Sequence, residues 1–145
     1  MMAKKERERE FHVSDVLSII TGRVVSTRHT DGVYDILNFM TGDNLFAHQF
    51  PRANDECKPW LLRWFPELAE AGTPNNLARL DELISNAKYR NEPTENGVAM
   101  WLKWMTEQGA CNLKEKYKVQ QIPQEVHQHK NPIEEVAEMI GQKKI

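Results

Sequence analysis

One internal repetition restricts the fold of this chain more than any other feature. Asp15-Val-Leu-Ser-Ile-Ile-Thr-Gly22 and Asp35-Ile-Leu-Asn-Phe-Met-Thr-Gly42 share an aspartate, a β-branched residue, a leucine, a small polar residue, two large apolar residues, a threonine and a glycine. Two copies are too few for a solenoid, which needs about three or more stacked units. We therefore expect a pair of short, similar helices.

Apolar spacing supports this expectation. In both segments apolar side chains recur at i, i+3, i+4 and i+7, which is one stripe of a helix. They are Val13, Val16, Leu17 and Ile20 in the first segment, and Val33, Ile36, Leu37 and Met40 in the second. Tyr34 and Phe39 widen the apolar surface of the second helix. We therefore expect the second helix at the centre of the core.

Capping residues stand at the ends of both predicted helices. Ser14 can cap the first helix, and Thr30 or Asp31 can cap the second. Gly22 and Gly42 can each adopt the left-handed conformation that commonly follows a helix. Both helices are therefore predicted to end at a Thr-Gly step.

The remaining sequence adds further short helices and little else. Apolar stripes and breakers predict a short helix over 43–50 that Asp43 begins and Pro51 ends, and a helix that starts near Pro59 and is kinked or split at Pro66. Further helices are predicted over 77–87, 94–109 and 131–141. The alternation in 116–122 predicts a strand, whereas 23–27 fits either a small strand or an extended connector. The expected fold is mainly α, a compact bundle of about six short helices with at most a small two-stranded β element.

The length of 145 residues favours one domain. Residues 1–10 carry alternating charges and are predicted to be a solvated leader or a frayed helical turn, and residues 11–145 to be a single helical domain. The loop at 71–76 leaves a subdivision at that point open. Cys57 and Cys111 have neither a paired spacing nor a neighbouring histidine, so we expect two buried or half-buried thiols.

Charge and hydropathy exclude some classes of function. A net charge of −2, from 19 basic and 21 acidic side chains, argues against both a general phosphate-backbone binder and an acidic mimic of DNA. No apolar run reaches the ~20 residues that span a bilayer, and no signal-peptide core follows the charged start. The sequence therefore predicts an intracellular protein with no membrane contact.

The densest set of polar candidates follows the second glycine of the repetition. They are Asp43, Asn44, His48, Gln49 and Arg52. One interpretation is the lip of a pocket for a polar or anionic ligand, with His48 carrying a proton and Arg52 clamping an anion. The other, which capping propensity favours, is that Asp43 and Asn44 cap a helix while His48 and Arg52 pair with nearby carboxylates.

A second polar group lies at the turn between the two predicted helices and consists of Arg28, His29 and Asp31, with Asp35 one helical turn further on. His-x-Asp occurs in many hydrolytic metal sites, but a catalytic metal usually has three or more protein ligands and no further cluster is evident. His127-Gln-His129 is expected in an exposed loop. The common nucleotide, zinc-protease and serine-hydrolase motifs do not occur. We predict no catalytic residue, no metal and no cofactor.

Four tryptophans form two pairs, Trp60 with Trp64 and Trp101 with Trp104. These spacings cannot place all four rings in one narrow core stripe, so we expect partial exposure of one or two. Burial is expected for Trp60 and Trp101. Trp104 is the candidate for exposure, and exposed tryptophan is a favoured interface anchor.

Three segments carry a family resemblance: Asp15-Val-Leu-Ser-Ile-Ile-Thr-Gly-Arg23, Gly32-Val-Tyr-Asp-Ile-Leu-Asn-Phe-Met-Thr-Gly-Asp-Asn-Leu-Phe-Ala-His-Gln-Phe-Pro-Arg-Ala53 and Pro59-Trp-Leu-Leu-Arg63. They resemble a family of small uncharacterised proteins from bacteriophages and prophages. The resemblance covers roughly residues 11–68, with a looser match at Asn131-Pro-Ile-Glu-Glu135. It implies an accessory protein of a mobile element that acts in the bacterial host cytoplasm. Such proteins are often inhibitors of host immunity, including anti-CRISPR proteins.

Three hypotheses follow, and the first is preferred. It is a phage-encoded protein that binds and inhibits a host defence protein or ribonucleoprotein complex, such as a CRISPR effector or a related nuclease, and it allows a homo-oligomer. The alternative is a small-molecule or nucleotide-binding protein, or a hydrolase, with its site at Asp43 to Arg52. The third is a nucleic-acid-binding regulator that uses Arg23, Arg28 and Arg52, which the near-neutral charge ranks last.

Overall fold

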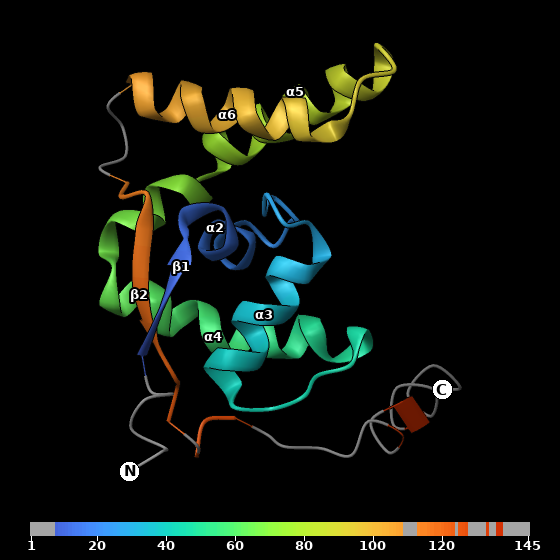
Figure 1. Ribbon diagram of the computed structural model, residues 1–145. Coiled ribbons are helices and arrows are strands. Elements are labelled where there is room, and N and C mark those ends of the chain that lie inside the picture. The colour runs from blue at the N-terminus through green and yellow to red at the C-terminus, as the bar shows by residue number, and fades with distance from the viewer. Residues whose placement is uncertain (1–7, 109–112, 124, 128–132, 134–135, 138–145) are drawn as a thin grey trace.

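The computed structural model of the chain describes residues 8–108, 113–123, 125–127, 133 and 136–137. Helices make up most of it, and two strands form a small antiparallel sheet (Figure 1). In chain order the elements are β1 (Glu8–His12), α2 (Val13–Thr21), α3 (Thr30–Thr41), the 3-10 helix η1 (Ala47–Gln49), α4 (Phe50–Trp64), the 3-10 helix η2 (Pro66–Gly72), α5 (Pro74–Tyr89), α6 (Thr94–Gln108) and β2 (Lys116–Gln120). The predicted mainly α fold with a small β element is confirmed.

Helix α2 forms the centre of the molecule. Every residue from Ser14 to Thr21 is buried, including the polar Asp15 and Ser18. The helix contacts β1, β2, α3, α4 and η2, and Figure 1 shows these elements arranged around it. The prediction that the second helix of the repetition is central is therefore wrong, because α3 covers α2 on one side and keeps exposed residues such as Asp31.

The predicted helix ends are confirmed, and the predicted starts are not. Gly22 and Gly42 lie in the left-handed region with φ of 69° and 68°. His12 caps α2 in place of Ser14, because its ring Nδ1 accepts a hydrogen bond from the Ser14 backbone N–H at 3.1 Å. Helix α3 starts directly after His29, without a side-chain cap.

The two strands pair over their full length, with Phe11 opposite Tyr117. The strand predicted at 116–122 is confirmed as β2, and its alternation buries Tyr117 and Val119. Its partner, however, is Glu8–His12. The prediction of a leader or frayed helical turn is thus wrong for residues 8–10, whose side chains are exposed although their backbone pairs with β2. Residues 23–27 form an extended connector and not a strand.

Pro51 lies in the first turn of α4 and does not end the helix before it. A missing N–H costs nothing in a first turn, so the predicted helix over 43–50 reduces to the single turn of η1. Asp43 consequently caps no helix. Pro59 lies inside α4 and not at its start. The predicted break at Pro66 is confirmed, since α4 ends at Trp64 and η2 begins at Pro66.

Helices α5 and α6 pack against each other and lie across the top of the molecule in Figure 1. The loop predicted at 71–76 is reduced to Thr73, whose hydroxyl caps α5 by accepting from the Asn76 N–H. The buried Trp101 of α6 donates its indole N–H to the Asn76 carbonyl at 2.9 Å. A subdivision near 71–76 stays a prediction. Most of the helix predicted over 131–141 lies outside the described residues.

No helix within the described part of the chain combines the length and the apolar character that crossing a membrane requires. Cys57 is fully buried, as expected, and burial together with the charge of Glu56 raises the pKa of its thiol far above the ordinary range. Cys111 lies outside the described residues.

The α5–α6 contact yields a stability prediction at Gly97. A Cβ there would lie 2.7 Å from the Leu83 backbone oxygen, so Gly97→Ala must separate the two helices. Alanine favours helix by about 1 kcal/mol, but overpacking against backbone costs about 1–3 kcal/mol. We expect urea unfolding to show a net loss of stability for Gly97→Ala. Ala99→Gly, at an exposed position of α6, should cost only about 0.5–1 kcal/mol. A Gly97→Ala variant as stable as the unchanged chain would contradict the close packing.

Candidate functional site

Two residues of the 43–52 cluster, Asp43 and Arg52, belong to a largely buried network of ionisable side chains. The Asp43 carboxylate lies 2.9 Å from His127 Nε2, and His127 Nδ1 lies 2.6 Å from the Glu56 carboxylate. Arg52 donates to the other Glu56 oxygen at 3.1 Å. The His127 side chain is only 3% exposed. This network fastens the segment after β2 onto α4, and the Ile122 N–H supports the same attachment by donating to the Met40 carbonyl of α3.

The other three residues of the cluster differ in burial. Asn44 is exposed, and its N–H donates to the Asp43 side chain. Gln49 is buried, and its side-chain oxygen accepts from the Phe46 N–H at 2.9 Å. His48 is half-buried, and its ring is in a T-shaped arrangement with that of Phe46, with centroids 6.0 Å apart. Asp43, Gln49 and Arg52 thus have partners within the chain, and a binding site formed by the five residues stays a prediction.

Glu56 and His127 are the members of this network that sequence reasoning missed. Glu56 is four residues after Arg52, which is the spacing of a helical ion pair, and this signal becomes visible once Pro51 is taken as a helix start. His127 carries no local signal. The expectation of an exposed loop is wrong for His127, and His129 lies outside the described residues.

Arg28 belongs to a second network, which joins the two aspartates of the repetition. Its guanidinium donates to Asp15 at 2.6 Å and to Asp35 at 2.9 Å, and Arg9 from β1 also pairs with Asp35. Partial burial alone would raise the pKa of Asp35, but the hydrogen bonds and charges of Arg9 and Arg28 outweigh it and hold this pKa below its ordinary 3.8. The hydrogen bond to Asp15, followed by that to Asp35, raises the pKa of Arg28.

Among the described interactions, His29 and Asp31 take no part in the Arg28 network, and a site formed by the three residues stays a prediction. His29 has a positive φ of 58°, and its exposed ring lies 3.8 Å from the exposed Glu95 carboxylate of α6. Asp31 is exposed in the first turn of α3. Across the described residues, no group of three or more histidine, cysteine, aspartate or glutamate side chains is placed to hold a metal ion.

The tryptophans differ in exposure. Trp101 is fully buried, whereas Trp60, Trp64 and Trp104 are half-buried, so the expected burial of Trp60 is only partial. The ring of Trp60 lies against that of Trp64 with centroids 6.0 Å apart.

Trp104 lines a hollow formed by α5 and α6. The hollow has a volume of about 250 Å³. The residues that line it are Arg79, Leu83, Met100, Lys103, Trp104 and Glu107, and we call this set of residues the Trp104 face. Met100 is 51% exposed, and the Arg79 guanidinium carbon lies 5.7 Å from the Trp104 ring centroid. Arg79 Nε is buried and has no hydrogen-bond partner in the part of the chain that the structure describes.

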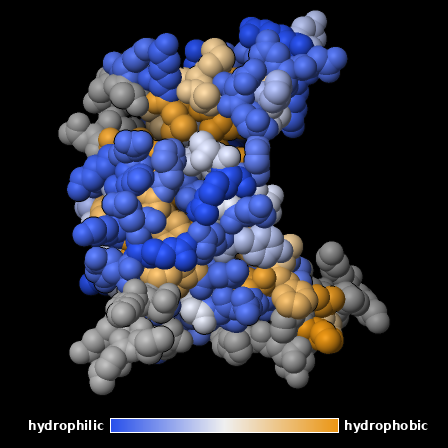
Figure 2. Space-filling model, viewed as in Figure 1, coloured by the Kyte–Doolittle hydropathy of each residue, from blue (hydrophilic) through white to orange (hydrophobic). Residues whose placement is uncertain are grey.

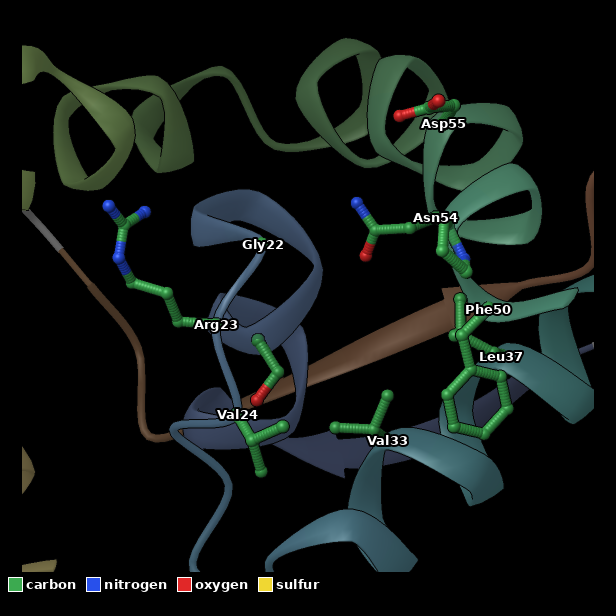
Figure 3. A pocket seen from close by; sticks show the side chains of 10 residues that line it. Gly22, Arg23, Val24, Val33, Leu37, Phe50, Asn54 and Asp55 are labelled. Carbon is green, nitrogen blue, oxygen red and sulfur yellow. The ribbon is translucent and has the colours of Figure 1, made fainter. Parts of the chain in front are cut away.

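Two cavities border the connector after α2. One of about 100 Å³ lies between the connector and α6, with Val24, Val98 and Leu102 in its wall. Figure 2 shows apolar surface between the α5–α6 pair and the rest of the molecule, while most of the remaining face is hydrophilic. The other cavity, of about 350 Å³, lies among α2, α3 and α4 (Figure 3). None of the five residues of the 43–52 cluster lines these cavities or the Trp104 hollow.

Residues 11–71 match the model of a domain of unknown function, DUF7736. This region runs from the last residues of β1 to the end of η2, and it contains the repetition, the 43–52 cluster and the larger cavity. No curated protein and no solved structure matches the chain. The α5–α6 pair, with the Trp104 face, lies beyond the matched region.

The Asp35 ion pairs predict a pH dependence. Because the folded-state pKa of Asp35 is lower than the unfolded value, its stabilising contribution is complete above about pH 3.8 and is lost as the pH falls through the folded-state pKa. We expect Asp35→Asn to lower the free energy of unfolding at neutral pH. The variant should also lose less of this free energy than the unchanged chain as the pH falls below about 3.8, as measured by urea unfolding at several pH values. The control is Asp31→Asn, since Asp31 makes no ion pair with another described residue. An Asp35→Asn profile parallel to that of the unchanged chain would contradict the assignment.

Proposed function

We propose that this chain acts by binding another protein through the Trp104 face. The observation that carries the proposal is the half-buried Trp104 beside the half-exposed Met100 and a hollow of about 250 Å³. Tryptophan, methionine and arginine are enriched in the buried centres of interfaces, and tryptophan and arginine dominate their energetics. A hollow flanked by these residues suits one inserted side chain of a partner.

Arg79 supports the same surface. A buried donor without an acceptor costs about 1–3 kcal/mol, and Arg79 Nε has none among the described residues. Its Nη1 is already hydrogen-bonded to Glu82. A partner acceptor placed at Nε would satisfy the guanidinium, so binding would be favoured by a group that the isolated chain leaves unpaired.

We propose further that the partner is a host defence protein or ribonucleoprotein complex, such as a CRISPR effector or a related nuclease, in the cytoplasm of a bacterial host. This part of the proposal is supported by the resemblance of residues 11–68 to accessory proteins of bacteriophages and prophages.

The two other hypotheses have less support. A nucleotide-binding or hydrolytic site at Asp43 to Arg52 would have to use side chains that are already joined through Glu56 and His127. A nucleic-acid-binding regulator would have to use Arg23, Arg28 and Arg52, which are all paired with carboxylates. Binding at either place would first break internal ion pairs.

The test is affinity capture from the lysate of a bacterium with an active CRISPR system, followed by titration of the purified partner. Trp104→Ala should weaken binding by about 2 kcal/mol, or about thirtyfold, if this ring is an interface anchor. Because Trp104 is half-buried, Met100→Glu is a second variant at an exposed position. The matched control is Tyr89→Ala, at a 93% exposed ring at the end of α5. If both Trp104→Ala and Met100→Glu bind the partner as tightly as the unchanged chain, the proposal that the Trp104 face is the interface is wrong.

A further inference from the structure

The cavity among α2, α3 and α4 has an apolar wall and a polar rim. Val33 and Leu37 of α3 and Phe50 of α4 provide the wall, and Val24 of the connector lies opposite α4. Figure 3 shows Asn54 and Asp55 projecting from α4 on one side and Arg23 from the connector on the other. A volume of about 350 Å³ is in the lower part of the range for small-molecule sites.

Most of the side-chain N–H donors of Arg23 and Asn54 at the rim already have acceptors within the chain. Arg23 donates through Nε and Nη2 to the Asp81 carboxylate at 2.6 and 2.8 Å, and through Nη1 to the Thr21 carbonyl at 2.8 Å. Asn54 donates its amide N–H to the Ile19 carbonyl at 3.1 Å. The Arg23 charge is therefore paired with that of Asp81, which weakens Arg23 as a site for an anion.

Acceptors at the rim remain available. The bond to Ile19 fixes the orientation of the Asn54 amide and leaves its side-chain oxygen as an acceptor. Asp55 is exposed and forms no ion pair with any residue that the structure describes. Helix α2 ends at Gly22 on this cavity and presents the negative end of its dipole, while the first turns of α4 present the positive end of theirs, so Asp55 supplies the net negative charge.

We propose that this cavity binds a small organic cation, a primary amine with an aromatic or branched aliphatic body. Its ammonium group donates to the Asp55 carboxylate and the Asn54 side-chain oxygen, while its body lies against Val33 and Phe50. A cation is selected because the Asp55 carboxylate has no ion-pair partner among the described residues and the neighbouring Asn54 oxygen is an acceptor. This site lies inside the region that matches the domain of unknown function, and it shares no lining residue with the Trp104 face. The proposed cation site is therefore independent of the proposed protein partner.

The experiment is an NMR titration of the full chain with isotope-labelled methyl groups, using 2-phenylethylammonium chloride as the probe. Two isosteres are compared with it, the neutral 2-phenylethanol and the anionic 3-phenylpropanoate. We expect saturable shifts of the Val33 and Leu37 methyl signals at millimolar ammonium. Since exposed ion pairs contribute about 0.2–1 kcal/mol, the neutral probe should bind about 1.4-fold to fivefold more weakly, and the anion more weakly still.

Two variants locate the charge that selects the cation. Asp55→Asn should weaken ammonium binding by about 1.4-fold to fivefold and leave binding of the neutral probe unchanged. Glu92→Gln, an exposed carboxylate in the turn between α5 and α6, is the matched control and should have no effect. Absence of methyl shifts with the ammonium probe, equal affinity for the anion, or an Asp55→Asn variant that binds as before would each overturn the proposal.

Discussion

The buried carboxylate of Asp15 is the interaction on which the rest of the structure depends. This side chain is 1% exposed at the centre of the molecule, and it accepts hydrogen bonds from the Ser26 hydroxyl at 2.5 Å and from Arg28 at 2.6 Å. A buried charge that loses its partner costs about 3–5 kcal/mol. The connector that carries Ser26 and Arg28 is therefore held against α2. The fit is tight, because a Cβ at Gly32 would overlap both Ser26 and Asp15.

The repetition acquires a physical meaning from this network. Arg28 joins Asp15 to Asp35, the equivalent residue of the second copy, and thereby joins α2 to α3. The fixed connector then supplies Arg23 and Val24 to the rim of the larger cavity, and Arg23 reaches Asp81 of α5. The same stretch of chain therefore shapes the cavity and helps to hold the α5–α6 pair, which carries the Trp104 face.

Sequence patterns predicted the helices whose formation depends on residues close together in the chain. The stripes in 13–20 and 33–40 and the glycines after them specify α2 and α3 by spacing alone. Strand β1 was missed because Phe11 is its only fully buried side chain and its partner is more than a hundred residues away in the sequence. Burial of the whole of α2 was missed for a related reason, since it depends on five elements packing around one helix.

The contacts of the candidate site residues likewise divide into local ones, which the sequence predicted, and long-range ones, which it did not. Pairing of Arg52 with a nearby carboxylate was among the expectations, because such pairing is local. The contact of Asp43 with His127 joins residues 84 positions apart, and no pattern near either residue announces it. The larger cavity uses Phe50, Asn54 and Asp55 on a helix whose start was misplaced by the interpretation of Pro51 as a terminator. Correct assignment of that proline would have placed these residues on the first turns of α4.

A double-mutant cycle between Asp15 and Arg28 tests most directly whether this network organises the fold. Asp15→Asn, Arg28→Met and the double variant would be compared with the unchanged chain by urea unfolding at neutral pH. The account predicts that the double variant loses less stability than the sum of the single variants, with a coupling of about 1 kcal/mol or more. Additive losses, within about 0.3–0.5 kcal/mol, would show that the connector is held by other contacts and would contradict the central role of Asp15.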